Sequence, residues 1–364
     1  MPSILFIWYK RSRGILEGGG QASKRNFELL RSLVGDEHID SYYVHDEYAR
    51  KTLWSYIRGA FFFLFRYYYG LTPRRVREIV RQAQAYDYVF IDRSLFGIVA
   101  KRLKESGYRG HILVYFHNVE AIYFDAKLPH LPGRNIIIRT ADQNDRYACR
   151  YADKVIALNE RDAQVLEQRY GRRANLLIPV TLSDRLTYTP TTEPTRSRPQ
   201  CLFFGAYFTP NNQGILWFVE HVLPHANIEL KIVGKGMAKL KAESSLLQDI
   251  EVVSDAPDLQ SYIEQADIVV LPIFSGSGMK VKTCESLMYG KNIVGTSEAF
   301  EGYTADYKRI GGLCNTAEEF IACLNRMAAH PRPRFNAYAR QIYLDHYSYQ
   351  AVQNAFRTLI SPEK

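Results

Sequence analysis

The stretch 271–303, LPIFSGSGMKVKTCESLMYGKNIVGTSEAFEGY, carries the strongest structural pattern in the chain. It starts at the end of an apolar run, Ile268–Leu271, which is typical of a buried strand, and continues into a glycine-rich loop, Ser275–Gly278. A helix-like segment follows and ends at Gly290, and a second apolar run begins at Asn292. Strand, loop, helix and strand in this order predict one unit of a parallel α/β sheet.

The start of that helix-like segment has the features of an anion site. Glycines let the backbone approach a ligand closely, unpaired N–H groups point toward it, and the helix dipole favours negative charge. Lys280 and Lys282 add positive charge for a diphosphate, and Glu285, a turn further on, can hold a ribose diol. Together these groups predict a site for a nucleoside diphosphate.

The same stretch resembles the donor-binding signature of family-4 glycosyltransferases, which are retaining enzymes with the GT-B fold. Their pattern is roughly a proline-ended strand, then G-S-G-x-[RK]-x-K-x-x-E-[AS]-[LM]-x-x-G-[KR]-x-[VI]-V. The matching positions are Gly276, Ser277, Gly278, Lys280, Lys282, Glu285, Ser286, Leu287, Gly290, Lys291 and Val294. The resemblance implies that Lys282 binds the diphosphate and Glu285 the ribose hydroxyls, both at the catalytic centre. Many members carry a second glutamate where this chain has Ser277, although the G-S-G branch commonly lacks it.

Composition narrows the class of protein. The 364 residues are enough for about two domains. Five cysteines without C-x-x-C spacing indicate neither a zinc site nor a disulfide framework, and a reducing, cytoplasmic compartment fits best. The net charge of +9 is compatible with nucleic acid, an anionic membrane surface or a phosphorylated substrate. We expect no nucleic-acid partner, because no nucleic-acid motif accompanies the charge.

The order of elements predicts two parallel α/β domains. Residues 1–182 alternate strands and helices, and residues 183–199, rich in Thr, Pro, Ser and Arg, are interpreted as a linker. The pattern restarts over 200–333, and a helical stretch covers 334–364. The resemblance implies the GT-B architecture, two Rossmann-like domains facing each other across a cleft. It also implies that the first domain binds the acceptor, the second binds the nucleotide sugar, and the last helix crosses back to the first.

The start of the second domain extends the resemblance. Family-4 members have F-x-G, then P-N, then a helix that contains W-F and ends at L-P. The matching residues here are Phe204, Gly205, Pro210, Asn211, Trp217, Phe218 and Pro224. Gly205 is therefore expected beside the donor, Asn211 either in the cleft or as a helix cap, and Trp217 with Phe218 in the core.

In the first domain the resemblance rests on shorter segments. Gly19 and Gly20 follow the first predicted strand, in a loop that faces the donor diphosphate in relatives. His117 and Glu120 lie in an H-N-x-E segment at the end of a strand. The resemblance places His117 beside the donor sugar or the acceptor hydroxyl as a catalytic residue. Glu120 is expected either to orient His117 or to contact the acceptor.

Residues 50–81 lie outside the resemblance. They hold eight basic residues and one acid, Glu78, around an aromatic centre, and an apolar helical face is predicted across residues 54–68. Basic, aromatic amphipathic helices bind anionic membrane interfaces, so we expect Arg50–Arg81 to contact the cytoplasmic face of a membrane. The alternative is that this helix packs in the core of the first domain.

These observations lead to one principal functional hypothesis and two alternatives. The first is a metal-independent, cofactor-free retaining hexosyltransferase that moves a sugar from a nucleotide-diphosphate donor to a glycan or lipid-linked acceptor, in cell-surface polysaccharide biosynthesis. No D-x-D pair stands in a plausible position, so Lys282 and the helix N-terminus are expected to stabilise the leaving diphosphate without a metal. The alternatives are a GT-B nucleotide-sugar epimerase and a catalytically silent GT-B binding subunit. The base, the sugar and the acceptor stay open.

Overall fold

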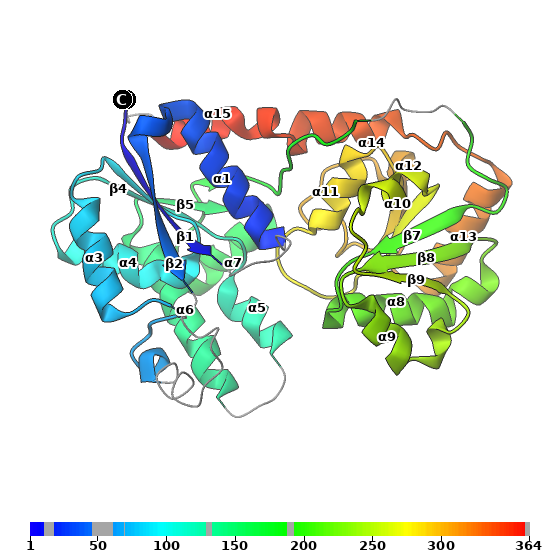
Figure 1. The fold of residues 1–364 in the computed structure, drawn as a ribbon, viewed down its shortest axis with the longest axis horizontal. Coiled ribbons are helices and arrows are strands. Elements are labelled where there is room, and N and C mark those ends of the chain that lie inside the picture. Colours follow the sequence, from blue (N-terminus) through cyan, green and yellow to red (C-terminus); the bar gives the residue numbers. More distant parts are fainter. Residues whose placement is uncertain (11–17, 46–60, 69, 129–132, 188–192, 361–364) are drawn as a thin grey trace. The chain divides into compact units, whose positions relative to one another are not determined.

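The computed structural model describes residues 1–364 except 11–17, 46–60, 69, 129–132, 188–192 and 361–364. Contacts divide the chain into two compact units. The first comprises Met1–Pro179 with Val352–Lys364, and the second Val180–Ala351. Each unit is a parallel sheet surrounded by helices (Figure 1). None of the helices in the described ranges is long and apolar enough to span a membrane.

The first unit contains a six-stranded sheet in the order β2-β1-β3-β4-β5-β6. Its strands are β1 (Ile4–Lys10), β2 (Ile39–His45), β3 (Tyr88–Ile91), β4 (His111–Tyr115), β5 (Lys154–Ala157) and β6 (Leu176–Leu177). Its helices include α1 (Gly18–Val34), α3 (Pro73–Ala83), α4 (Gly97–Glu105), α5 (Glu120–Lys127), α6 (Arg134–Tyr151) and α7 (Glu160–Tyr170). All four residues of β3 are buried, as expected for a strand covered on both faces.

The second unit has the strand order β12-β11-β10-β7-β8-β9. Its strands are β7 (Gln200–Phe204), β8 (Glu229–Gly234), β9 (Glu251–Ser254), β10 (Ile268–Leu271), β11 (Asn292–Gly295) and β12 (Gly311–Leu313). Its helices are α8 (Thr209–His221), α9 (Met237–Glu243), α10 (Gln260–Gln265), α11 (Val281–Met288), α12 (Tyr307–Ile310), α13 (Ala317–Ala329) and α14 (Ala337–Ile342). This is the strand order of dinucleotide-binding folds, and it reverses between β7 and β10.

Reversal of the strand order locates the ligand edge of each sheet. Where consecutive connections leave a parallel sheet in opposite directions, a crevice opens at the carboxyl ends of the strands. In the second unit that point lies between the segments that follow β7 and β10. In the first unit it lies between the segments that follow β1 and β3, and Asp92 directly follows β3.

The segment interpreted as a linker, residues 183–199, packs within the second unit where it is described. Thr195 donates its backbone N–H to the carbonyl of Arg332, and Asp184 accepts two hydrogen bonds from Arg340. At the other end, residues 343–347 form a π-helical turn, and α15 (Tyr349–Ile360) follows Ser348. From Val352 onward α15 belongs to the first unit, where the Ile360 carbonyl accepts from the Tyr88 hydroxyl.

The aromatic stretch does not continue as one helix, so the expected apolar face across residues 54–68 is wrong in its described part. Residues 61–64 are helical, the chain then turns, and Arg66 has a positive φ of 67°. Thr140 and Asn144 of α6 hold this turn by hydrogen bonds to the carbonyls of Phe63 and Arg66. Residues 50–60 of the prediction lie outside the described residues.

As a result the aromatic side chains divide between core and surface. Phe63 and Tyr67 are buried, whereas Phe61, Leu64 and Phe65 are each more than half exposed. A new helix, α3, begins at Pro73, where Thr72 caps it by accepting the Arg75 N–H.

Candidate functional site

The glycine-rich loop of the second unit lies between β10 and α11, at the ligand edge of the sheet. Gly276 and Gly278 adopt φ angles of 152° and 61°, which residues with a Cβ atom rarely adopt. Within the part of the chain that the structure describes, no acceptor takes the backbone N–H groups of Gly276, Ser277 or Gly278. The loop therefore holds several N–H donors that no described residue accepts, as phosphate-binding loops do.

Lys282 lies in the first turn of α11 and is held beside this loop. Its ammonium donates to Oδ1 of Asn211 at 2.7 Å and lies 4.8 Å from the centre of the Phe203 ring. The amide of Asn211 in turn donates to the carbonyl of Ala206. Burial lowers the pKa of Lys282 to about 7, and the nearby charge of Lys280 adds to this effect. A bound phosphate would favour the charged ammonium, so this lysine is prepared for an anionic ligand.

Gly205, which directly follows β7, leaves room for that lysine. A Cβ atom at this position would lie 2.9 Å from the Lys282 ammonium and 2.9 Å from the Asn211 amide nitrogen. Any larger residue would therefore displace one of the two side chains. The expected proximity of Gly205 to the lysine site thus has a steric reason.

Lys280 has a different environment. Its ammonium donates to the Gly278 carbonyl at 3.0 Å and forms an ion pair with Glu298 at 2.6 Å. The carboxylate of Glu298 therefore offsets much of the charge that Lys280 brings to the loop. Glu298 could not be predicted from the sequence, because nothing in the resemblance marks that position.

Glu285 lies one turn after Lys282 on α11 and is almost fully buried. Its carboxylate accepts from the guanidinium of Arg185 at 2.7 Å. Burial raises the pKa of Glu285, and Arg185 opposes this shift. Arg185 was also missed, because its surrounding sequence has no pattern that distinguishes it from other arginines.

In the first unit, His117 and Asp92 follow adjacent strands, β4 and β3. The His117 Nε2 lies 3.3 Å from Oδ2 of Asp92, and Oδ1 of Asp92 accepts from the Asn26 amide of α1 at 2.7 Å. All three residues are buried. Burial lowers the pKa of His117, and Asp92 opposes that shift. A neutral imidazole fixed by a carboxylate can accept or share a proton near pH 7.

Glu120, the first residue of α5, is buried close to a second carboxylate. Asp145 of α6 accepts the Ala121 N–H at 3.1 Å, and its pKa is raised by burial, with a further contribution from Glu120. Asp92 is the residue seen to contact the His117 ring, and both roles expected for Glu120 stay predictions. Gly19 and Gly20 lie in the first turn of α1 rather than in a loop before it.

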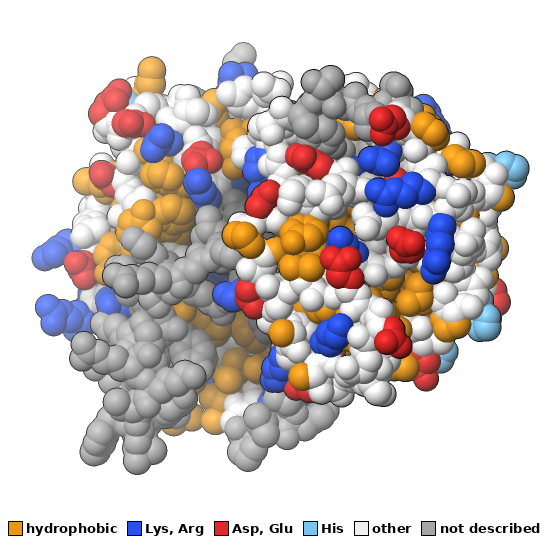
Figure 2. All heavy atoms as spheres, turned by 45° about the vertical axis from the view of Figure 1, so that its right-hand side comes forward, with side chains coloured by type: hydrophobic (Ala, Val, Ile, Leu, Met, Phe, Trp, Pro, Cys, Tyr) orange, Lys and Arg blue, Asp and Glu red, His pale blue; other side chains and the backbone are white. Residues whose placement is uncertain are grey.

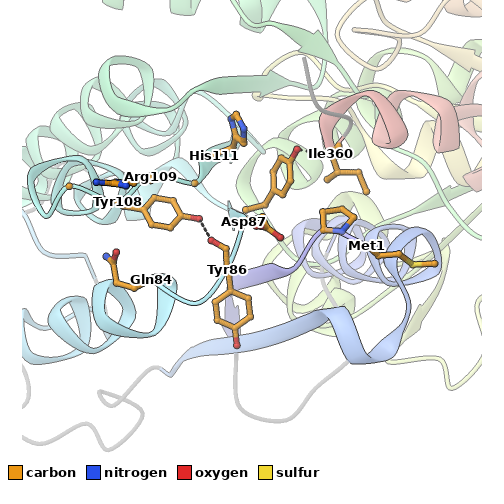
Figure 3. A pocket seen from close by; sticks show the side chains of 12 residues that line it. Met1, Gln84, Tyr86, Asp87, Tyr108, Arg109, His111 and Ile360 are labelled. Carbon is orange, nitrogen blue, oxygen red and sulfur yellow. Dashed lines mark hydrogen bonds between the residues drawn. The ribbon is translucent and has the colours of Figure 1, made fainter. Parts of the chain in front are cut away.

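The first unit also has a hollow of about 740 Å³ at the opposite edge of its sheet (Figure 3). It lies where β3 and β4 begin and is lined in part by Tyr86, Asp87, Tyr108 and His111. The Tyr108 hydroxyl donates to the Tyr86 carbonyl, and Asp87 accepts from Ser3. The polar groups of this hollow thus hydrogen-bond to one another at the start of β3 and β4. His117 follows the opposite end of β4, so the hollow is separate from the His117 site.

Comparison with a family model identifies the second unit. Residues 198–330 match the model described as glycosyl transferases group 1. A curated relative, an uncharacterized 44.6 kDa protein in the cps region of Klebsiella pneumoniae, is 30% identical over 115 residues. That alignment covers 28% of this chain and 30% of the relative, so the chain spans less than a third of the relative's length.

Solved structures resemble the chain over its whole length. A sucrose-phosphate synthase from Thermosynechococcus elongatus has a TM-score of 0.71 with 15% identity, covering 99% of this chain and 98% of that one. HepE from Anabaena, in complex with UDP and glucose, has a TM-score of 0.66 with 13% identity and complete coverage of both chains. The lipopolysaccharide outer core galactosyltransferase WaaB has a TM-score of 0.65 with 15% identity, covering 98% and 100%.

The family model and the structural likeness agree with the architecture expected from the glycine-rich stretch. At these identities the structural likeness concerns the fold. Residues 198–330 of the second unit match the group 1 glycosyl transferase model, and the chain as a whole has the fold of the GT-B glycosyltransferase structures that it resembles.

Proposed function

We propose that this protein is a retaining glycosyltransferase that takes a sugar from a nucleotide-diphosphate donor. The observation that carries the proposal is the anion cradle at the ligand edge of the second unit. The cradle combines the N–H groups of Gly276–Gly278, which no described residue accepts, with the ammonium of Lys282, and these groups are proposed to bind the diphosphate. The carboxylate of Glu285, one turn further on, is proposed to bind the ribose hydroxyls. The solved structure of HepE with UDP and glucose supports a nucleotide-sugar ligand for this fold.

The chemistry needs these groups at the leaving phosphate. The bond between the anomeric carbon and the diphosphate oxygen breaks, the acceptor hydroxyl forms the new bond, and its proton ends on the released diphosphate. Negative charge grows on the phosphate in the transition state, where preorganised N–H donors and a cation stabilise it. We propose that Lys282 and the loop supply this stabilisation without a divalent metal.

The buried His117–Asp92 pair is proposed to act on the acceptor side or at the donor sugar. Asp92 fixes the ring, and burial keeps the imidazole neutral, so His117 can receive a hydrogen bond from a hydroxyl. Asp92 is a positioning residue in this proposal, since it acts through His117.

The acceptor is proposed to be a glycan or lipid-linked precursor of a cell-surface polysaccharide, used at an anionic membrane surface on the cytoplasmic side. The relative in the cps region of Klebsiella pneumoniae supports the polysaccharide context. Exposed Phe61, Leu64 and Phe65 support membrane contact, together with the exposed arginines 74, 77 and 81 of α3. On the face of the second unit that Figure 2 brings forward, basic and acidic side chains are interspersed.

The test is a thermal-shift panel with UDP, GDP, TDP and ADP, followed by sugar release and transfer assays in excess EDTA. We expect one nucleotide to stabilise the protein, and its sugar derivative to be turned over with the anomeric configuration retained. Glu285→Gln is expected to weaken nucleotide binding, while Lys308→Ala, a change at an exposed lysine on α12, serves as the control. Absence of nucleotide binding would exclude the proposed function, and a strict need for added metal would exclude its metal-free form.

A further inference from the structure

The second unit contains another pocket, whose lining includes residues next in sequence to parts of the anion cradle. Its volume is about 330 Å³, at the small end of the range for small-molecule sites. It lies between α8 and the segment that follows β10. The lining residues are Pro210, Gln213, Gly214, Trp217, Phe274, Ser275 and Asn315. Pro210 precedes the Asn211 that holds Lys282, and Ser275 precedes the glycine-rich loop, so two lining residues are chain neighbours of the cradle.

Two aromatic rings form the apolar wall of this pocket. Trp217 and Phe274 meet edge to face, with ring centres 4.5 Å apart and an interplanar angle of 77°. Trp217 is half-buried and its inner side meets Phe320, whereas the Phe274 side chain is 46% exposed. The expectation of core packing is therefore met by Phe218, which is fully buried, and only in part by Trp217.

Close backbone packing fixes that wall in place. A Cβ atom at Gly214 would lie 1.7 Å from the carbonyl oxygen of Pro272, so only glycine lets α8 approach the end of β10 this closely. The two aromatic side chains therefore lie on α8 and on the segment after β10, whose backbones are in close contact at Gly214 and Pro272. A preformed wall of this kind is typical of ligand pockets rather than of loosely exposed aromatic residues.

The polar side chains that line the pocket are neutral, and most of their hydrogen-bonding groups have no partner among the described residues. Asn315 accepts from the N–H and hydroxyl of Ser297 through Oδ1, and within the described residues its Nδ2 has no protein acceptor. The side chains of Gln213 and Ser275 likewise make no hydrogen bond to described residues. No lining residue is charged, so an anionic or cationic ligand would lack a counter-ion here.

We propose that this pocket binds one neutral sugar ring. The C–H face of a pyranose packs on aromatic rings, while its hydroxyls both donate and accept, which suits amide and hydroxyl side chains. The proposal deepens the proposed function, and rests on it for the source of the sugar. That source is either the donor or a sugar unit of the acceptor glycan, and both present the same chemistry.

The experiment measures binding of methyl glycosides of glucose, galactose, mannose and N-acetylglucosamine by saturation-transfer NMR. At least one should bind the wild type, with saturation strongest at its ring C–H protons. Phe274→Ala and Gln213→Ala should each weaken that binding roughly five-fold or more, because each removes one contact. Leu246→Ala, which removes a similarly exposed apolar side chain elsewhere in the second unit, should leave it unchanged.

Competition separates the two sources. Displacement of the methyl glycoside by a nucleotide sugar, but not by its nucleoside diphosphate, assigns the pocket to the donor sugar; simultaneous binding with the nucleotide sugar assigns it to the acceptor. No binding of any of the four glycosides, or binding that both pocket variants retain in full, would overturn the proposal. Nucleoside diphosphate binding is followed in the same samples, and its absence would count against the proposed function instead.

Discussion

The candidate sites of the two units lie at the carboxyl edge of similar parallel sheets, but they consist of different chemical groups. In the second unit the cradle consists mainly of backbone N–H groups and a lysine, on a loop whose glycines allow close approach. In the first unit the corresponding positions hold three buried side chains, Asn26, Asp92 and His117, joined by hydrogen bonds. Phosphate is recognised by charge and N–H donors, whereas a hydroxyl is recognised by a fixed, neutral proton acceptor.

The largest expected effect, and the strongest test of this difference between the two sites, comes from removing the positive charge of Lys282 in the cradle. Lys282→Met keeps the bulk of the side chain and should lower kcat/KM for transfer roughly 100- to 1,000-fold, because one preorganised donor at the developing charge is lost. Nucleotide affinity should fall as well, and the melting temperature should not. Wild-type activity in this variant, measured as sugar transfer, would contradict the role of Lys282.

The next largest effect should come from the first unit. His117→Ala is expected to lower kcat roughly 100-fold, in the range of general acid–base contributions, with nucleotide affinity unchanged because the cradle is intact. Asp92→Asn should lower kcat less and shift its pH profile, since the amide still contacts the ring but no longer stabilises its charged form. If both variants retain a wild-type pH profile, the pair has only a structural role.

The pH dependence of nucleotide binding should sharpen the contrast between the two sites. Since the pKa of free Lys282 is about 7 and a bound diphosphate raises it, binding takes up a proton above pH 7. Affinity should therefore fall roughly ten- to fifty-fold from pH 7 to pH 9. Calorimetry in buffers of different ionisation enthalpy measures this uptake. Lys282→Arg, which stays charged, should bind with little pH dependence, and a steep dependence in that variant would assign the proton elsewhere.

The smallest expected effect concerns the exposed basic helix of the first unit. Arg74→Ser should weaken binding to vesicles containing phosphatidylserine about five-fold, because one basic residue at such a surface contributes roughly 1 kcal/mol. Arg173→Ser, on the segment after α7, is the control for loss of a charge. Co-sedimentation at low salt measures the effect. If the wild-type protein does not bind anionic vesicles, the basic residues of α3 do not form a membrane-binding surface, and the comparison of the two units then rests on their ligand edges alone.

Much of the fold could be predicted from the sequence because its core strands are uninterrupted apolar runs. Strand β10 has the predicted bounds, Ile268–Leu271. Local signals also mark the ends of helix α7, where Asn159 caps the start and a left-handed Gly171 follows the last residue. Strand β2 was not predicted because Asp40 and Ser41 interrupt its apolar residues, and β12 because two of its three residues are glycine.

The cradle was predictable for a related reason. Glycines and lysines at fixed spacing describe a backbone loop directly, so the sequence alone was enough to locate Gly276, Gly278 and Lys282. Asp92 and Arg185 could not be found in this way, because each matters only through a partner far away in sequence, 25 residues for His117 and 100 for Glu285. The prediction of one continuous helical face in the aromatic stretch was wrong, because Thr140 and Asn144, far along the chain on α6, hold the turn at residues 63–66.

The steric requirement for glycine at position 205 has a consequence for how related sequences should vary during evolution. Because a Cβ atom there would press on the Lys282 ammonium and the Asn211 amide, the glycine, the lysine and the asparagine are sterically coupled, although they lie on three separate segments. A lineage that replaced the glycine would have to discard the lysine in the same step or relocate it. Among descendants of a common ancestor, these three positions should therefore change together, and a chain with a side chain at position 205 should no longer depend on a lysine at position 282.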